Sequence, residues 1–163
     1  MFALRYAALL GAALWSGGLL GLGLFAAPAT FEIIASRGVP DGRVLAGAIF
    51  SETLRRFHLF SYACGAVILG SLLLRAALGP RPAYTGPRLA IAAVMLGTAL
   101  FSGIYLTSRI ERTRAEAGGA PSALAQDDPR RVTFGRLHAV STIIQIVPLL
   151  GGLVLLFWEL RDR

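Results

Sequence analysis

The sequence predicts an all-α fold: an integral membrane four-helix bundle with a short interfacial helix after the first transmembrane helix. Hydrophobic residues make up 55 % of the 163 residues and charged residues only 15 %, too little charge for the surface of a soluble domain of this size. The apolar residues are also gathered in blocks. Each block is close to the roughly 20 residues that a helix needs to cross the hydrocarbon core of a bilayer. Apart from His58 and His138, these blocks carry no charged or titrating group other than tyrosine or cysteine: residues 6–31, 57–74, 89–108 and 137–158.

Helices are the only secondary structure that suits these blocks. Backbone groups in lipid must be hydrogen-bonded within their own segment, and the alternation that a membrane β-barrel requires is absent. We therefore expect one transmembrane domain over residues 1–163, surrounded by the lipid bilayer. The predicted helices cover about residues 2–27, 41–77, 87–107 and 129–160.

The first predicted helix ends before Pro28, because the residue before a proline disfavours the helical conformation. Its apolar run is too long for the core of a secretory signal, so we expect it to be retained. Residues 30–36 follow as the short interfacial helix, with Phe31, Ile33 and Ile34 available to lie on the membrane surface.

Turn and capping residues delimit the other helices. Asp41 is the expected N-cap of the second helix, and Asp128 followed by Pro129 is typical of the start of the last one. The run Gly79-Pro80-Arg81-Pro82 predicts a tight connection between the second and third helices.

Four crossings place both chain ends and the 79–82 turn at one end of the bundle, which we call the tight end. The segments 30–56 and 108–136 then lie at the other, loop-rich end. Arginine counts and the arginine before the first helix give conflicting orientations, so the orientation in the membrane stays open.

The net charge of +7 is carried by arginine alone, without lysine. These arginines flank apolar blocks, where their usual role is anchoring at the lipid headgroups, so we expect no nucleic-acid binding. A composition without lysine is typical of a GC-rich bacterial genome. We therefore expect a multi-pass protein of the bacterial inner (plasma) membrane.

Two histidines lie inside the predicted crossings, where polar groups are costly and signal packing or function. His58 and His138 each stand two residues beyond an arginine, Arg56 and Arg136, and should lie at similar depth near the loop-rich end. Each heads a polar stripe at helical spacing. Turned inward, the stripes predict a polar pocket formed by Ser61, Tyr62, Ser102, Tyr105, Ser141 and Gln145.

Four interpretations of this pocket are compatible with the sequence. The pocket is a hydrogen-bonded interior that fixes helix registry, a haem site, a divalent metal site, or a route for a substrate or proton. In the haem reading, haem b is held by His58 and His138, and Arg55, Arg56 or Arg136 pairs with its propionates. Two histidines without a nearby carboxylate or thiolate make a poor metal site, so the identity of any metal is unknown.

Catalytic equipment is not visible in the sequence. It contains no nucleophile elbow, phosphate-binding loop, HExxH or CxxC motif, and the single cysteine, Cys64, lies inside an apolar block. We therefore name no catalytic residue and expect the protein not to be an enzyme.

Several short motifs resemble the transmembrane protein 205-like family. They are Leu14-Trp15-Ser16-Gly17-Gly18, Ala26-Ala27-Pro28 with Phe31, Ala46-Gly47 with Phe50, and Phe134-Gly135-Arg136-Leu137-His138-Ala139-Val140-Ser141. Gln145 stands where we associate an asparagine with that family. The resemblance implies a four-helix membrane domain of unknown function.

The sequence thus favours an uncharacterised integral membrane protein, a non-enzymatic structural or accessory subunit of a membrane complex that binds other membrane protein subunits. The alternative is a haem- or metal-binding redox or transport protein that uses His58 and His138.

Overall fold

The computed structural model describes residues 2–79 and 84–161, and every element in these residues is helical. Four helical spans of 35, 37, 32 and 33 residues are long and apolar enough to cross a membrane. This confirms the predicted fold class, a multi-pass all-α membrane protein. The spans are built from α1 (Phe2–Gly21), η1 (Leu22–Ala26) and α2 (Ala27–Ser36); α3 (Gly42–Leu78); α4 (Thr85–Leu100), η2 (Phe101–Leu106) and α5 (Thr107–Glu116); and, after the short η3 (Pro121–Ala123), α6 (Pro129–Ile144) and α7 (Ile146–Arg161).

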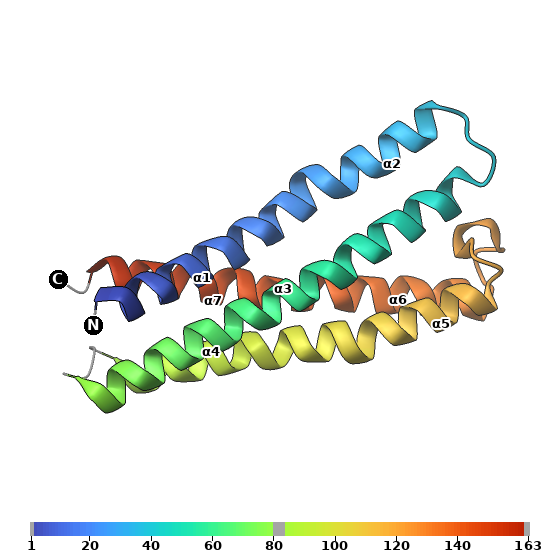
Figure 1. The fold of residues 1–163 in the computed structure, drawn as a ribbon. Helices are drawn as coiled ribbons and strands as arrows, with labels where there is room; N and C mark the ends of the chain where they lie inside the picture. The colour runs from blue at the N-terminus through green and yellow to red at the C-terminus, as the bar shows by residue number, and fades with distance from the viewer. Residues whose placement is uncertain (1, 80–83, 162–163) are drawn as a thin grey trace.

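The two ends of the bundle are arranged as the sequence predicts. The start of α1, the end of α3, the start of α4 and the end of α7 lie together at the tight end, and the α2–α3 and α5–α6 connections lie at the loop-rich end (Figure 1). The predicted turn at Gly79–Pro82 falls mostly outside the described residues.

The tight half is a closed four-helix ring. In it α1 packs against α3, α3 against α4, α4 against α7, and α7 against α1. Its core includes Trp15, Ile68, Leu72, Met95 and Leu155, each no more than 3 % exposed. Burying these large side chains between the helices fixes their packing.

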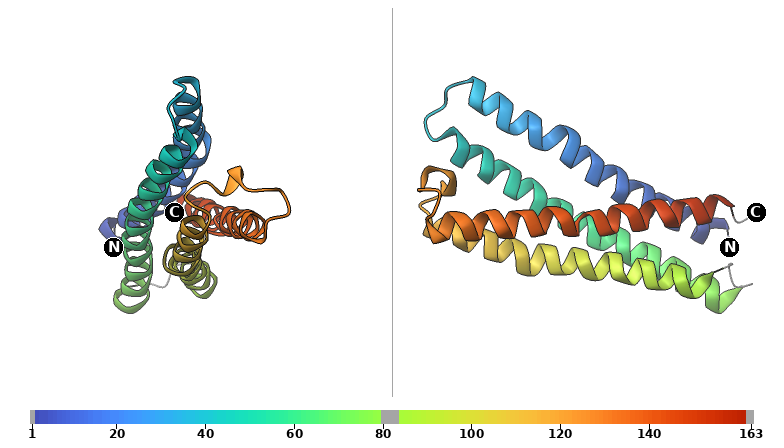
Figure 2. Two further views of the ribbon diagram at one scale, coloured as in Figure 1. Left: turned by 90° about the vertical axis from the view of Figure 1, so that its right-hand side faces the viewer. Right: turned by 180° about the vertical axis from the view of Figure 1, so that it is seen from behind.

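The loop-rich half is open. There α2 packs mainly on α3, and α5 packs on α6, while α2 and α6 are not among the helix pairs that pack together. Seen from behind, the backbone of α1–α2 diverges from that of α7–α6 toward the loop-rich end (Figure 2), and we call the angle between α2 and α6 the wedge. The link from α3 to α5 is polar: the Ser51 hydroxyl donates to Glu111 Oε1 at 2.5 Å, and Arg114 Nη2 donates to the Val44 carbonyl at 3.4 Å.

The first span does not end at Pro28, which corrects the sequence prediction. It continues through the π-helical turn η1 into α2, so residues 30–36 are the end of a long helix rather than a separate interfacial one. In η1 the Ala27 amide donates to the Leu22 carbonyl, five residues back. This wider turn relieves the clash that a proline ring makes with the preceding turn of a regular α-helix.

Two further boundaries differ from the sequence prediction. The third span runs to Glu116 instead of ending near residue 107, because η2 leads directly into the polar helix α5. Asp41 does precede α3, but its φ of 55° is left-handed and its side chain makes no capping hydrogen bond. Asp128, by contrast, accepts a 2.8 Å hydrogen bond from the Arg130 amide, which confirms it as the N-cap of α6.

Three of the four spans change their helical geometry at a similar level, between the closed and the open half. The changes are the π-helical turns η1 and η2 and the break at Gln145 between α6 and α7. We call the depth in the bundle at which they lie the hinge level. Pro148 accounts for the third change, because it has no N–H to continue the helical hydrogen bonds. Only α3 passes this level as one uninterrupted helix.

Candidate functional site

A small cavity lies where the four spans meet, at the hinge level. The volume in which the centre of a water molecule fits is about 10 Å³. Its lining comes from every span: Trp15 and Leu19; Phe57, His58 and Ser61; Thr98, Ala99 and Ser102; and Ile144, Gln145 and Pro148. The cavity is within one helical turn of all three irregular points, since Leu19 is three residues before η1, Ser102 is in η2 and Gln145 is the α6–α7 break.

His58 projects from α3 into this region and is only 5 % exposed. Gly103 in η2 makes room for it. A Cβ atom on Gly103 would lie 2.8 Å from His58 Cγ and would collide with the Tyr62 hydroxyl. The absence of a side chain at residue 103 is therefore what lets the imidazole and the phenol approach the η2 backbone.

The polar groups of the cavity divide into two kinds. Ser61 donates to the Phe57 carbonyl at 2.9 Å and Thr98 donates to the Val94 carbonyl at 2.9 Å, so both are satisfied within their own helices. His58 Nδ1 and Ser102 Oγ are buried and make no hydrogen bond with the described residues. A buried polar group without a partner costs about 1–3 kcal/mol, so such groups call for an explanation.

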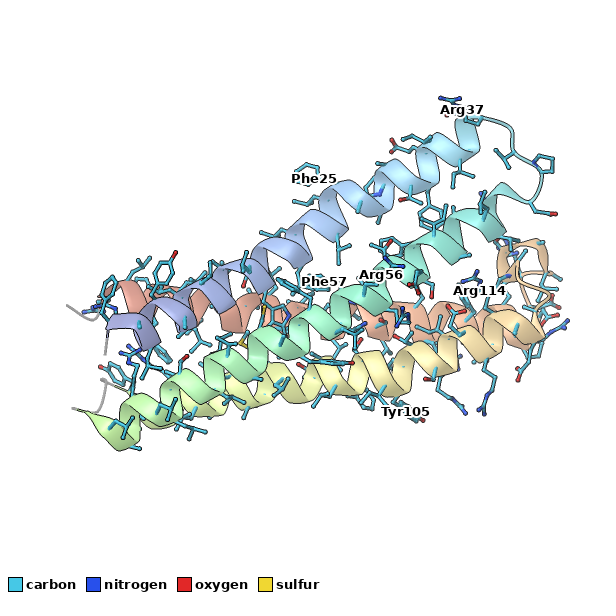
Figure 3. All side chains as sticks on the ribbon, in the orientation of Figure 1. Phe25, Arg37, Arg56, Phe57, Tyr105 and Arg114 are labelled. Atoms are coloured by element: carbon cyan, nitrogen blue, oxygen red, sulfur yellow. The ribbon has the colours of Figure 1, made fainter. Side chains whose placement is uncertain are left out.

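The predicted polar pocket is only partly assembled. Ser61, Ser102 and Gln145 line the cavity with His58, Tyr62 is half-buried beside it, and Ser141 is buried in α6 without lining it. Tyr105 is 52 % exposed and stacks on Phe101 on the outer side of the bundle (Figure 3). The π-helical turn explains this difference: it changes the rotation per residue, so spacing that assumes a regular α-helix misplaces residue 105.

The second histidine lies elsewhere. His138 is exposed on α6, where its ring stacks on Phe134 with a centroid separation of 6.1 Å, and it does not line the cavity of His58. The structure therefore does not bring the two histidines together.

The arginines proposed for haem propionates do not approach His58 either. Arg55 and Arg56 are exposed and pair with Glu52 at 2.7 Å each, and Arg136 is exposed on α6. A cofactor pocket is typically on the order of 300 Å³ or larger, far more than the cavity beside His58 offers. The residues present do not fit a haem held by both histidines, and that reading remains a sequence-based prediction without a site.

A buried cluster of charges at the tight end was missed by the sequence analysis. Glu159 on α7 is 3 % exposed and accepts hydrogen bonds from Arg75 Nη1 at 2.7 and 2.8 Å and from Arg88 Nη1 at 2.8 Å. Arg5 lies 3.8 Å from the same carboxylate and also donates to the Glu159 backbone carbonyl. The guanidinium of Arg88 lies 5.8 Å from the Trp158 ring centroid.

This cluster joins all four spans, because Arg5, Arg75, Arg88 and Glu159 come from α1, α3, α4 and α7. The sequence did contain a signal for it. Each apolar block has an arginine or a carboxylate at its tight end, and only the last block has a glutamate there. Opposite charges at one depth in a membrane protein are expected to pair.

Among the described residues there is no group of three or more histidine, cysteine, aspartate or glutamate side chains placed to hold a metal ion. Cys64 is buried as a free thiol in the core of the tight half.

Comparison with known proteins gives one match. A family model described as a domain of unknown function (DUF4149) matches residues 6–118, more than two thirds of the chain. The matched range covers the first span from residue 6 onward and all of the second and third, and it includes the Gly103–His58 contact. No curated protein and no solved structure matches the chain. The similarity to the transmembrane protein 205-like family remains a resemblance of short motifs.

Proposed function

Since the chain belongs to the DUF4149 family, which is defined by a domain of unknown function, we propose that it is a non-enzymatic accessory subunit of a membrane complex. In this proposal the closed half is a rigid membrane anchor and the open half receives a helix of another membrane protein.

The observation that carries the proposal is the exposure of α2. None of its ten residues is buried, and it packs mainly on one neighbour, α3. The backbones of α2 and α6 diverge toward the loop-rich end (Figure 2). A four-helix unit that needs no partner would be expected to close around its own core along its whole length.

The length of the first span adds to this argument. Its 35 residues make a helix of roughly 50 Å, whereas the hydrocarbon core of a bilayer is roughly 30 Å thick. The part nearest the loop-rich end therefore extends beyond the hydrocarbon or tilts strongly within it. Phe31 and Ile33 in this part are 43 % and 57 % exposed, and apolar side chains beyond the lipid chains favour contact with a protein partner.

The buried polar groups support a structural role. Glu159 is fully engaged by arginines from other helices, and the cavity beside His58 is too small for an organic substrate. Neither arrangement offers the open, positioned acid, base or nucleophile that catalysis requires.

Purification of the full chain in a mild detergent tests this proposal. We expect a second membrane protein to be recovered at a fixed molar ratio. Single tryptophan substitutions at Ile33 in α2 and at Val140 and Ile143 in α6 should release it, because these side chains are exposed on the two diverging helices, where added bulk interferes with docking. Matched substitutions at Val94, Leu150 and Leu153, which are exposed on the closed half, should leave the ratio unchanged.

A stable monomer, or a homo-oligomer without a second protein, would contradict the accessory role. So would loss of the partner with equal frequency in both sets of variants. The absorption spectrum of the same preparation decides the haem alternative, which requires a Soret band that disappears in both H58A and H138A.

A further inference from the structure

Two polar atoms of the cavity-lining residues, His58 Nδ1 and Ser102 Oγ, have no hydrogen-bond partner among the described residues, and both side chains are deeply buried. Ser102 is 1 % exposed and His58 is 5 % exposed. They come from neighbouring spans, η2 and α3, and both line the same cavity. A serine in a helix usually satisfies its hydroxyl by donating to a carbonyl one turn back, as Ser61 does here. Ser102 makes no such bond, so its hydroxyl is available to an occupant of the cavity.

The Leu54 backbone, one helical turn before His58, lies near the imidazole. Among the described residues, however, His58 Nδ1 has no hydrogen-bond partner of acceptable distance and angle. Nδ1 is therefore a buried donor or acceptor whose partner is not supplied by the described residues.

The opposite wall of the cavity is a broken helix. Pro148 has no N–H, so the carbonyl of Ile144 loses the hydrogen bond that a regular helix would give it. Ile144, Gln145 and Pro148 all line the cavity. A helix break inside a membrane protein is tolerated where side chains or ordered water satisfy the freed backbone groups. The fourth span thus brings to the cavity wall a residue, Ile144, for whose carbonyl Pro148 cannot serve as a hydrogen-bond donor.

The size of the cavity limits what can occupy it. A space of about 10 Å³ for the centre of a water molecule is enough for about one water. The lining residues include no carboxylate and only one imidazole, which is a poor ligand set for a divalent cation. A buried water needs at least two polar partners, and His58 Nδ1 and Ser102 Oγ are the two buried, unpartnered atoms among the residues that line the cavity.

We propose that this cavity is a binding site for one internal water molecule, held between His58 Nδ1 and Ser102 Oγ at the hinge level. The water completes the hydrogen bonding of both side chains and connects α3 to η2 and to the broken fourth span. It thereby stabilises the helix packing at the hinge level, between the closed half and the open half. This site is independent of whether the wedge binds another subunit.

Histidine-labelled protein in lipid nanodiscs tests the site by NMR, because the chain has only two histidines. H138N identifies the signals of His58 by elimination. We expect transfer of magnetisation from a slowly exchanging water to the His58 ring. S102V should abolish this transfer, because valine fills the cavity and removes the hydroxyl. S71V is the matched control: Ser71 is 5 % exposed on α3 and does not line the cavity, so the transfer should persist.

Three results would overturn the proposal. The first is wild-type protein in which the His58 ring receives no magnetisation from water. The second is a measured hydrogen-bond coupling between His58 Nδ1 and the Leu54 carbonyl. The third is transfer that survives unchanged in S102V. Should S102V fail to fold, as judged from its His138 signal, S102A replaces it; there the transfer should weaken, because the water loses one partner, and unchanged transfer would equally contradict the site.

Discussion

Among single residues, Glu159 has more charged partners than any other described carboxylate, since Arg5, Arg75 and Arg88 all approach it. We predict that E159Q destabilises the protein by about 3 kcal/mol, because removing one member of a buried ion pair leaves the other charges uncompensated. E52Q is the control: Glu52 pairs with Arg55 and Arg56 on an exposed surface, where ion pairs contribute little. Thermal unfolding in detergent measures both, and equal stability of the two variants would contradict a structural role for the cluster.

Gly103 gives the second prediction at this scale. We expect G103A to cost about 1–3 kcal/mol, because its Cβ would meet His58 and the Tyr62 hydroxyl and force them from their positions. Gly97 lies on the same span with nothing within 4 Å of an added Cβ. G97A should therefore be neutral or stabilising, by up to about 1 kcal/mol, since alanine is the better helix former. The same unfolding measurement compares them; a neutral G103A would mean that His58 is not held as described.

Residue by residue, the structure brings together part of the polar pocket that the sequence predicted and leaves two of its residues exposed. The polar-stripe argument placed His58, Ser61, Ser102 and Gln145 near one another, because helical spacing holds along most of each span. It placed His138 and Tyr105 on the inside as well, and both are exposed. Periodicity says which residues share a face, but it does not say which face turns inward once a helix changes geometry.

At the scale of the helical elements, the start of α6 offers a prediction that depends on pH. Hydrogen bonds from the Arg130 side chain and amide lower the pKa of Asp128 from 3.8 to about 2. A carboxyl group with a lowered pKa stabilises the folded state above its ordinary pKa, and this contribution is lost as the pH falls toward about 2. We predict that the first turn of α6 frays in wild type as the pH falls from about 4 to about 2.

Two variants separate the charge of Asp128 from its capping oxygen. D128A should show a frayed first turn already at neutral pH, because it has neither. D128N keeps a capping oxygen and should be insensitive to pH in this range. The NMR chemical shifts of the Arg130 and Arg131 amides report the fraying, and a wild-type titration identical to that of D128N would contradict the cap.

The elements themselves were largely predictable, and their ends were not. Charge-free blocks located all four spans, because the membrane imposes length and apolarity on any helix that crosses it. Pro28 was expected to end the first helix, but a π-helical turn accommodates it. Whether a proline ends a helix depends on the geometry of the preceding turn, and local sequence does not specify that geometry.

For the molecule as a whole, the contrast between the two halves was not predictable from the sequence. A uniform four-helix bundle satisfies the same hydrophobic pattern as a bundle that opens at one end. The difference comes from three local changes at the hinge level, η1, η2 and the Gln145 break, acting together on one side of the continuous helix α3. Both the proposed partner site and the proposed water site depend on this transition from closed to open.

Pairs of spin labels in lipid nanodiscs test that transition directly. In a background where the single cysteine is removed by C64A, one pair replaces Tyr6 and Leu160 at the tight end, and a second replaces Ser36 and Thr133 at the loop-rich end; all four positions are exposed. We predict a short separation for the Tyr6–Leu160 pair and a clearly longer one for the Ser36–Thr133 pair, because α1 packs on α7 whereas α2 diverges from α6 (Figure 2). Equal short separations at both ends would show a bundle closed along its whole length and would contradict the account.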